Sequence, residues 1–269
     1  MSGHPVLGGY SVGGVLAGQT AIITGASGGL GAHFARLLAA EEAAVALAAR
    51  RLDMVEALAG EIAGAGGRAM AIRLDVAQAE TIAPAFGEIE SALGPVSILV
   101  NNAGVGGEGL AIDLSIEDWD RTFAVNTRGV FFAAQAAARL MMANGAADRA
   151  EARIVNIASI ASHTVLPGLS AYNASKAATA MLTRSLAREW SRRGIAVNAL
   201  CPGYIETDIN SFWWGTDGGQ KQLKLFPRRR LMEATDLDAA FMMLCGPAAR
   251  AIAGSIITID DGQTLPGGG

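Results

Sequence analysis

The hydrophobic positions of the chain fall into short apolar runs separated by longer stretches of helical character. Each run is close to the length of a β-strand, as expected for parallel strands that are buried on both faces. There are seven such runs: Thr20–Thr24, Ala44–Ala48, Ala69–Leu74, Val96–Val100, Arg153–Ala158, Ile195–Leu200 and Ser255–Ile259.

The stretches between these runs predict helices. Leu52–Ala65 and Ala171–Arg193, for example, are rich in Ala, Leu, Glu and Arg. A regular alternation of strand and helix predicts an α/β fold, a doubly wound parallel sheet of the Rossmann type in a single domain. A closed barrel is disfavoured because it needs eight strands and because the glycine-rich loop follows the first strand.

Three segments depart from this rhythm. Residues 1–15 are glycine-rich and predict a flexible tail, which leaves 16–265 as the single folded domain. The segment Ala143–Glu151 predicts a polar surface loop. The segment Thr207–Met232 is long, aromatic and basic, and it fits neither a strand nor a regular core helix.

The composition limits the classes of function. Apolar residues make up 51% of the 269 residues, enough for a large core. A net charge of −4 gives no general attraction to nucleic acid or to anionic lipid. No apolar stretch is long enough to span a membrane and no secretory signal precedes the first strand, so we expect a cytoplasmic protein. Cys201 and Cys245 lie in separate apolar runs, which predicts free buried thiols, and no cluster has metal-ligand spacing.

A glycine-rich loop connects the first strand to the helical stretch Ala32–Glu41. Its sequence is Thr24-Gly25-Ala26-Ser27-Gly28-Gly29-Leu30-Gly31. Glycine allows a tight turn and a close approach of the backbone to a pyrophosphate, and the helix N-terminus adds N–H groups and a partial positive charge. The alternative is a plain connection in a chain with 34 glycines. The position between strand and helix favours nucleotide binding.

The Gly-x-x-x-Gly-x-Gly spacing resembles that of the short-chain dehydrogenase/reductase family, and further motifs of that family follow in order between residues 16 and 262. They are Asp75, Asn101-Asn102-Ala103-Gly104, Asn126, Ser159, Tyr172-x-x-x-Lys176 and Pro202-Gly203 with Thr207. The resemblance implies cofactor contacts from Gly25, Ser27, Gly29, Leu30, Gly31, Asp75, Val76, Asn102, Ala103, Gly104, Tyr172, Lys176, Pro202, Gly203, Ile205 and Thr207.

Arg50 and Arg51 follow the second strand, where this fold distinguishes NADP(H) from NAD(H). A carboxylate at this place would accept a hydrogen bond from the 2′-hydroxyl of NAD(H), but none occurs between Val45 and Leu52. A guanidinium instead pairs with the 2′-phosphate of NADP(H). The sequence therefore favours NADP(H), with NAD(H) as the alternative if the arginines only begin the next helix in solvent.

The resemblance also implies the catalytic group. Tyr172 would act as general acid in reduction and general base in oxidation, and Lys176, one helical turn on, would favour its phenolate. Ser159 would hold the carbonyl or alkoxide oxygen, and Asn126 would anchor a water through its backbone. The expected reaction interconverts a carbonyl compound and a secondary alcohol, as a carbonyl reductase does.

Phe212, Trp213 and Trp214 lie in the segment Thr207–Met232, which leaves the sheet at the carboxyl ends of the strands. Three adjacent aromatic residues predict the apolar wall of a mobile lid, with Gly215, Gly218 and Gly219 as hinges, and a hydrophobic or aromatic substrate. In the alternative, the rings pack against the core or a neighbouring subunit.

The sequence departs from the family pattern at several positions, none of them catalytic: Gly28, Ala196 and Asp260-Asp261-Gly262.

Other interpretations are an NAD-dependent alcohol dehydrogenase of the same family and a non-catalytic dinucleotide-sensing protein. The second is disfavoured because Tyr172 and Lys176 are both present. The resemblance implies a homotetramer or homodimer formed through the helices near Trp119–Met142 and Ala171–Arg193.

Overall fold

The computed structural model describes residues 14–106, 109–206 and 211–265, and within them the seven apolar runs form one parallel sheet. The strands are β1 (Thr20–Thr24), β2 (Ala44–Ala49), β3 (Ala69–Arg73), β4 (Val96–Asn101), β5 (Arg153–Ile157), β6 (Ala196–Pro202) and β7 (Ile256–Ile259). Their order is β3-β2-β1-β4-β5-β6-β7. This order confirms the predicted doubly wound sheet, because the chain moves outward from β1 to one edge and then from β4 to the other.

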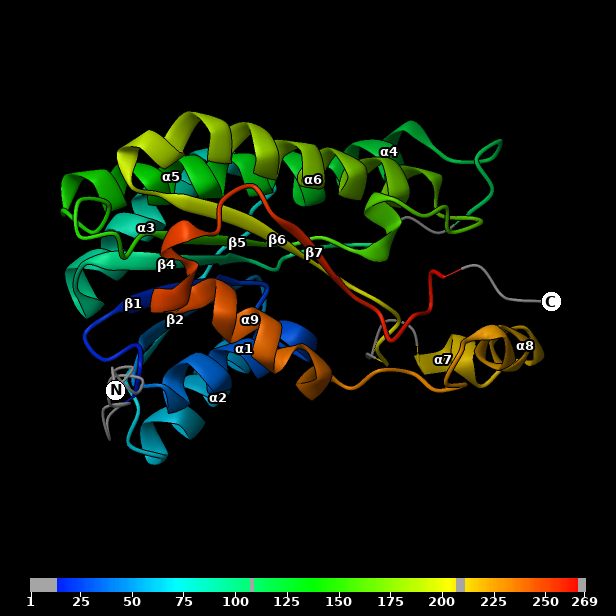
Figure 1. Ribbon diagram of the computed structural model, residues 1–269, viewed down its shortest axis with the longest axis horizontal. Coiled ribbons are helices and arrows are strands. Elements are labelled where there is room, and N and C mark those ends of the chain that lie inside the picture. Colours follow the sequence, from blue (N-terminus) through cyan, green and yellow to red (C-terminus); the bar gives the residue numbers. More distant parts are fainter. Residues whose placement is uncertain (1–13, 107–108, 207–210, 266–269) are drawn as a thin grey trace, which may run out of the picture.

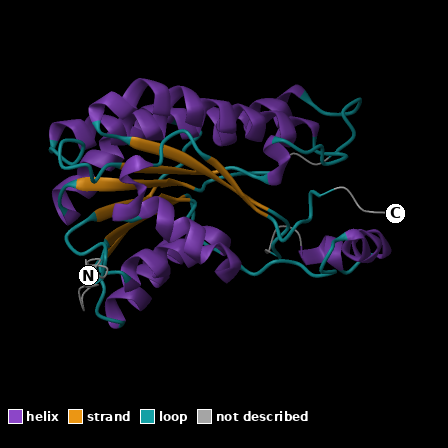
Figure 2. Ribbon diagram, viewed as in Figure 1, coloured by secondary structure: helices purple, strands orange, loops and turns teal. Residues whose placement is uncertain are grey.

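Helices cover both faces of the sheet (Figures 1 and 2). One face carries α1 (Gly29–Ala40), α2 (Leu52–Gly64) and α9 (Asp238–Cys245). The other carries α3 (Ala79–Leu93), α5 (Val130–Ala143) and α6 (Ser170–Trp190), with α4 (Ile116–Phe123) beside α6. Short 3-10 turns lie at η2 (Ile160–Ser162), η3 (Ser191–Arg193), η4 (Ala234–Leu237) and η5 (Pro247–Ala251).

Alternation along the strands divides the core into two halves. In β2, Val45 and Leu47 pack into the cluster under α1, α2 and α9. Ala46 and Ala48 face the cluster under α3, α5 and α6. Side chains of a strand point alternately to opposite faces, so an all-apolar strand supplies both halves.

A short polar ladder crosses the core beneath the site described below. Asn101 Nδ2 donates to Asn156 Oδ1 at 2.9 Å, and Asn156 Nδ2 donates to Thr183 Oγ1 at 2.9 Å. All three side chains are buried, so their polar groups need these partners. The ladder fixes α6 against β4 and β5.

Two segments differ from the sequence-based expectation. Within Ala143–Glu151 the chain does form turns, but Ala146 and Ala147 are 0% and 3% exposed because they close one end of the core. Beyond β6 the chain forms two helices, α7 (Ser211–Trp214) and α8 (Asp217–Leu225), at the carboxyl end of the sheet (Figure 1). At four and nine residues, both helices are too short for a helical period to stand out in the sequence, and local packing stabilises them.

The two cysteines are free and buried, as predicted. In the described ranges, no helix combines the length and apolar character needed to cross a membrane.

Candidate active site

The site begins where the strand order reverses, between the neighbouring strands β1 and β4. The connections that follow these two neighbouring strands lead to helices on opposite faces, which leaves a crevice at the carboxyl edge. A cavity of about 710 Å³ begins in this crevice and extends to the loops that follow β5 and β6.

Glycine is required at two positions of the loop after β1. Gly25 has φ of 68°, and a Cβ atom there would lie 2.7 Å from the Cα atom of Ala103. A Cβ atom on Gly31 would lie 2.3 Å from the carbonyl oxygen of Gly25. Gly31 therefore allows the start of α1 to pack against the carbonyl of Gly25. Unlike Gly25 and Gly29, it does not line the cavity.

Asn102 and Thr24 join the glycine loop to the end of β4. Asn102 Nδ2 donates to the carbonyl oxygens of Thr24 and Gly25, both at 3.1 Å. Thr24 Oγ1 accepts from the backbone N–H groups of Asn102 and Ala103, also at 3.1 Å. These bonds hold the two loops in one rigid cradle, whose inner surface includes Asn102, Ala103 and Gly104.

The crevice is positively charged at the end of β2. Arg50 and Arg51 both line the cavity, and Arg51 donates through one terminal nitrogen to Ser27 Oγ at 3.0 Å. Neither arginine forms an ion pair with another described residue. Asp75 lies farther along, where its carboxylate accepts from the N–H of Ala77 at 3.0 Å. Two guanidinium groups beside a hydroxyl form a suitable site for a phosphate.

Ser159, Tyr172 and Lys176 meet at the other end of the cavity, and all three line it. Ser159 follows β5 and caps η2, where its Oγ accepts from the N–H of Ala161 at 3.1 Å. Tyr172 lies in the first turn of α6 and its hydroxyl is hydrogen-bonded to Ser159. Lys176 is one turn on, with Nζ 5.7 Å from the centre of the Tyr172 ring.

Burial determines the charge states of this pair. It raises the pKa of Tyr172 above its ordinary value, and the hydrogen bond to Ser159 opposes this only in part. Burial also lowers the pKa of Lys176 to about 8, although Nζ donates to the carbonyl oxygen of Ile157 at 2.9 Å. Burial therefore leaves Tyr172 a neutral phenol at pH 7 in the cofactor-free chain. The expectation that the charge of Lys176 favours the phenolate stays a prediction.

Asn126 lies behind the cavity wall, in the π-helical turn η1 (Ala124–Gly129) that joins α4 to α5. Its side chain donates to the carbonyl of Val105 at 2.9 Å and to Ser175 Oγ at 3.0 Å, and accepts from the N–H of Val105 at 2.9 Å. Its own carbonyl accepts from Thr179 Oγ1 at 2.7 Å. Asn126 thus fixes the loop after β4 to α6, and its expected role as a water anchor stays a prediction.

Apolar side chains surround the space beside Tyr172. They are Ile160, Leu166, Leu169, Tyr204 and Ile205. Of these, Ile205 was expected at the cavity and Tyr204 was not. The signal for Tyr204 was its place directly after Pro202-Gly203, at the carboxyl end of β6.

Comparison with known proteins decides the family. The sequence signature of the short chain dehydrogenase family matches residues 19–217. The chain belongs to the short-chain dehydrogenase family. It is therefore an oxidoreductase that acts on CH–OH groups.

Several relatives of this dehydrogenase are named for polyols or sugar acids. D-threitol dehydrogenase of Mycolicibacterium smegmatis is 34% identical over 250 residues, covering 93% of this chain and 94% of the relative. Galactitol 2-dehydrogenase (L-tagatose-forming) of Cereibacter sphaeroides is 37% identical, with coverage of 93% and 96%. The structure of gluconate 5-dehydrogenase from Burkholderia cenocepacia in complex with NADP and tartrate is 33% identical. It superposes with a TM-score of 0.88 over 94% of this chain and 97% of that one.

The three aromatic residues of the dehydrogenase expected to line a substrate lid do not line the cavity. Phe212 is 86% exposed, and Trp213 donates through Nε1 to Gln222 Oε1 at 3.0 Å. Trp214 is buried, with its ring centre 5.3 Å from that of Tyr204 and 6.3 Å from that of Phe226. The reason is that α7 and α8 pack on each other, so that Trp213 lies against Gly218 and Trp214 against Tyr204, while Phe212 faces solvent.

The glycines of this segment serve that packing. A Cβ atom on Gly218 would lie 2.6 Å from the Trp213 ring, and one on Gly219 would lie 2.2 Å from the Trp213 carbonyl oxygen. Close approach of α7 to α8 therefore requires both glycines, which were expected as hinges. Thr207, expected near the nicotinamide, lies outside the described residues.

Proposed function

We propose that this dehydrogenase interconverts a carbonyl compound and a secondary alcohol, with NADP(H) as its preferred cofactor and Tyr172 as general acid and base. One observation carries the proposal. A single cavity joins the glycine loop and Arg51 at one end to Ser159 and Tyr172 at the other.

The residues of the crevice fit a phosphorylated dinucleotide. Gly25 lets a pyrophosphate approach the backbone at the N-terminus of α1, where N–H groups and the helix dipole favour an anion. Arg50 and Arg51 with Ser27 would hold a 2′-phosphate, and the similar gluconate 5-dehydrogenase was solved with NADP. When bound, the cofactor supplies or accepts the hydride. NAD(H) would bind the same cradle but would leave the two guanidinium groups without a phosphate.

The protein's own chemistry is proton transfer. The raised pKa keeps the Tyr172 hydroxyl protonated at neutral pH, so it can donate its proton to the oxygen of a carbonyl that is being reduced. Ser159 would hold that oxygen through its hydroxyl and so stabilise the developing alkoxide. In the reverse direction the phenol must first lose its proton. The buried charge of Lys176, 5.7 Å from the ring, would stabilise the resulting phenolate.

The apolar surroundings of Tyr172 support a hydrophobic or aromatic substrate. Leu166, Leu169 and Ile205 offer no side-chain donor or acceptor to the several hydroxyls of a polyol. The names of the relatives favour a second candidate, oxidation of a polyol or sugar acid. Rates with a panel of aromatic ketones and polyols, each with NADPH or NADP and with NADH or NAD, separate the two. Equal use of the phosphorylated and unphosphorylated cofactors would contradict the role of Arg50 and Arg51.

Replacement of Tyr172 by phenylalanine tests the proton transfer. Tyr172→Phe keeps the packed ring and removes the hydroxyl, so kcat should fall by about 10²–10⁴-fold. The dissociation constant for NADPH, measured by nucleotide fluorescence, should stay within about threefold of the unmodified value. A kcat for Tyr172→Phe above about a tenth of the unmodified value rules out the assigned role.

We also propose a homo-oligomer formed through the outer faces of α5 and α6. These helices border a groove lined by Phe131, Met142, Leu182 and Trp190, among others. Met181 on α6 is 58% exposed. Apolar side chains of this size on one face favour burial against a partner.

A further inference from the structure

The turn that follows β7, residues 260–264, is packed tightly against the loop that follows β6. The N–H of Gly203 donates to the carbonyl of Ile259 at 2.9 Å. A Cβ atom on Gly203 would lie 2.5 Å from Gln263 Oε1 and 2.8 Å from the Cα atom of Asp260. These two segments cannot shift independently of each other without breaking a close contact.

Gln263 holds the backbone of Tyr204 from one side. Its Oε1 accepts from the N–H of Tyr204 at 2.7 Å. On the other side, the carbonyl of Tyr204 accepts from the N–H of Met232 at 3.0 Å. Tyr204 is therefore fixed between the C-terminal turn and the segment that returns from α8.

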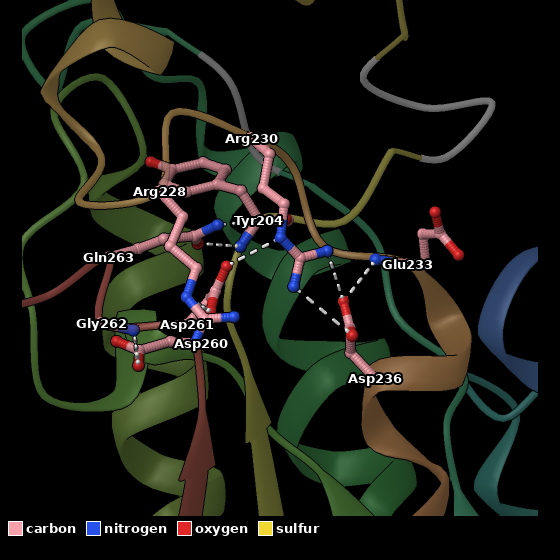
Figure 3. Close-up of polar contacts among 9 residues, drawn as sticks. All are labelled: Tyr204, Arg228, Arg230, Glu233, Asp236, Asp260, Asp261, Gly262 and Gln263. Atoms are coloured by element: carbon pink, nitrogen blue, oxygen red, sulfur yellow. Dashed lines mark hydrogen bonds and ion pairs between the residues drawn. The ribbon is translucent and has the colours of Figure 1, made fainter.

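Asp261 ties that same returning segment to the turn (Figure 3). Its Oδ1 lies 3.1 Å from Arg228 Nε, and its Oδ2 lies 3.0 Å from Arg230 Nε. Arg230 also reaches Asp236 Oδ2 at 3.0 Å. The side chain of Asp261 is only 11% exposed, whereas those of Arg228 and Arg230 are 70% and 40% exposed, so a shielded carboxylate interacts with two guanidinium groups that remain in contact with solvent.

The backbone of Asp261 makes its presence informative. It has φ of 55°, in the left-handed region that glycine adopts freely and that aspartate and asparagine adopt more often than other side chains. Glycine would suit this backbone best, and the two ion pairs give a carboxylate a role here that glycine cannot fill.

The side chain of Tyr204 connects the C-terminal turn to the cavity, because its backbone is held by Gln263 and it lines the cavity. Tyr204 and Tyr172 pack against the same small cluster of Ile160, Ala161 and Leu166. The ring of Tyr204 also stacks on Phe226, with centres 5.4 Å apart and planes at 25°. A shift of Tyr204 would thus change the width of the cavity beside the Tyr172 hydroxyl.

We propose that Asp261, Gln263, Arg228 and Arg230 form a clasp that positions Tyr204 as the substrate-selecting wall of the cavity. Asp261 and Gln263 are positioning residues, since they act on the substrate only through Tyr204. The inference rests on the proposed function, in which the substrate lies beside Tyr172. It adds the residues that set the fit of the substrate.

Replacements of Asp261 separate this role from folding. Asp261→Gly removes the carboxylate and also relieves the left-handed backbone, whereas Asp261→Asn keeps the shape and removes the charge. Both should raise KM for the best carbonyl substrate by at least about tenfold, with kcat within about threefold. The dissociation constant for NADPH should not change. The matched control is Arg229→Gln, which removes a charge from the same run where no ion pair with a described residue is lost.

Two replacements of Gln263 form a second, independent pair of variants. Gln263→Met removes the acceptor for the Tyr204 N–H at similar volume and should raise KM for the carbonyl substrate. Gln263→Glu keeps an acceptor oxygen, so its KM should stay close to that of the unmodified enzyme. Trypsin provides a readout without turnover, because Lys221 and Lys224 lie in α8. Both Asp261 variants should be cut faster at these lysines than the unmodified chain and the Arg229→Gln control.

Several outcomes would overturn the clasp. Unchanged KM in Asp261→Gly and Gln263→Met, with only a lower melting temperature, would make the turn purely structural. A parallel rise in the dissociation constant for NADPH would place the effect on the cofactor. If Tyr172→Phe stays active while Asp261→Gly raises KM, the acid–base assignment fails and the clasp stands. If Tyr172→Phe is inactive and both Asp261 variants behave like the unmodified enzyme, the acid–base assignment stands and the clasp fails.

Discussion

Two ionisable side chains, Tyr172 and Lys176, lie buried one helical turn apart on α6, and burial moves both toward their neutral forms. For the lysine the consequence can be followed in the stability of the fold. Its pKa falls from 10.5 to about 8, so the unfolded chain binds the proton more tightly than the folded one. The folded state is therefore destabilised below pH 8, where the buried lysine is charged. The free energy of unfolding rises between pH 8 and pH 10.5 as this destabilisation disappears.

Lys176→Met should remove this pH dependence. In the cofactor-free protein, the stability of the variant relative to the unmodified chain should be greatest below pH 8. That difference should shrink by about 3 kcal/mol between the two pKa values, because each pKa unit corresponds to about 1.36 kcal/mol. Denaturant unfolding at a series of pH values measures it. A difference that is constant across this range would mean that the lysine is not desolvated.

At the residue scale, the sequence predicted which side chains meet at the cavity far better than how they behave there. Ser159, Tyr172 and Lys176 have diagnostic spacing, and the fold brings them together. The pKa shifts depend on burial, which no spacing encodes. Tyr204 was missed because its place at the cavity is fixed by a backbone contact with Gln263, 59 positions away in the chain.

The glycine loop and helix α2 offer a matched pair of replacements at the scale of elements. Gly31→Ala would force a Cβ atom to within 2.3 Å of the Gly25 carbonyl oxygen, so the loop must open. The dissociation constant for NADPH should rise by at least about tenfold, measured by nucleotide fluorescence. Gly60 lies exposed in α2, and a Cβ atom there would meet no atom within 4 Å.

Gly60→Ala should accordingly stabilise the protein. Alanine is favoured over glycine in a helix by about 0.8–1 kcal/mol, which raises the melting temperature of a domain of this size by about 2–4 °C. Its affinity for NADPH should be unchanged. A Gly31→Ala protein that binds NADPH normally would show that the loop tolerates a side chain, and the cradle would need another explanation.

Elements were predictable in proportion to how regular their patterns are. The strands begin and end within two residues of the apolar runs, because burial on both faces leaves an uninterrupted signal. The helices α7 and α8 gave no such signal. Their order comes from packing of Trp213 on Gly218 and of Trp214 on Tyr204, contacts that a periodicity cannot express.

At the scale of the whole molecule, α6 presents Met181 to the outside although it packs on the sheet with its inner face. If this outer face lies between subunits, Met181→Arg should bury an unpaired charge and dissociate the oligomer. The expected result is a smaller species in light scattering after size-exclusion chromatography. Met54→Arg is the control, since Met54 is 45% exposed on α2. A monomeric unmodified protein would contradict the proposed oligomer.

The site is spread very unevenly along the chain, and this has a consequence for biosynthesis. In the proposed binding mode the adenosine end of the crevice uses Gly25, Arg51, Asp75 and Asn102, all within the first 102 residues. The clasp needs Asp261 and Gln263, which the ribosome adds about 160 residues later. Because synthesis proceeds from the N-terminus, a nascent chain acquires every residue of its adenosine crevice well before it can select a substrate. An unfinished chain would therefore hold the residues of a nucleotide site without those that set substrate specificity.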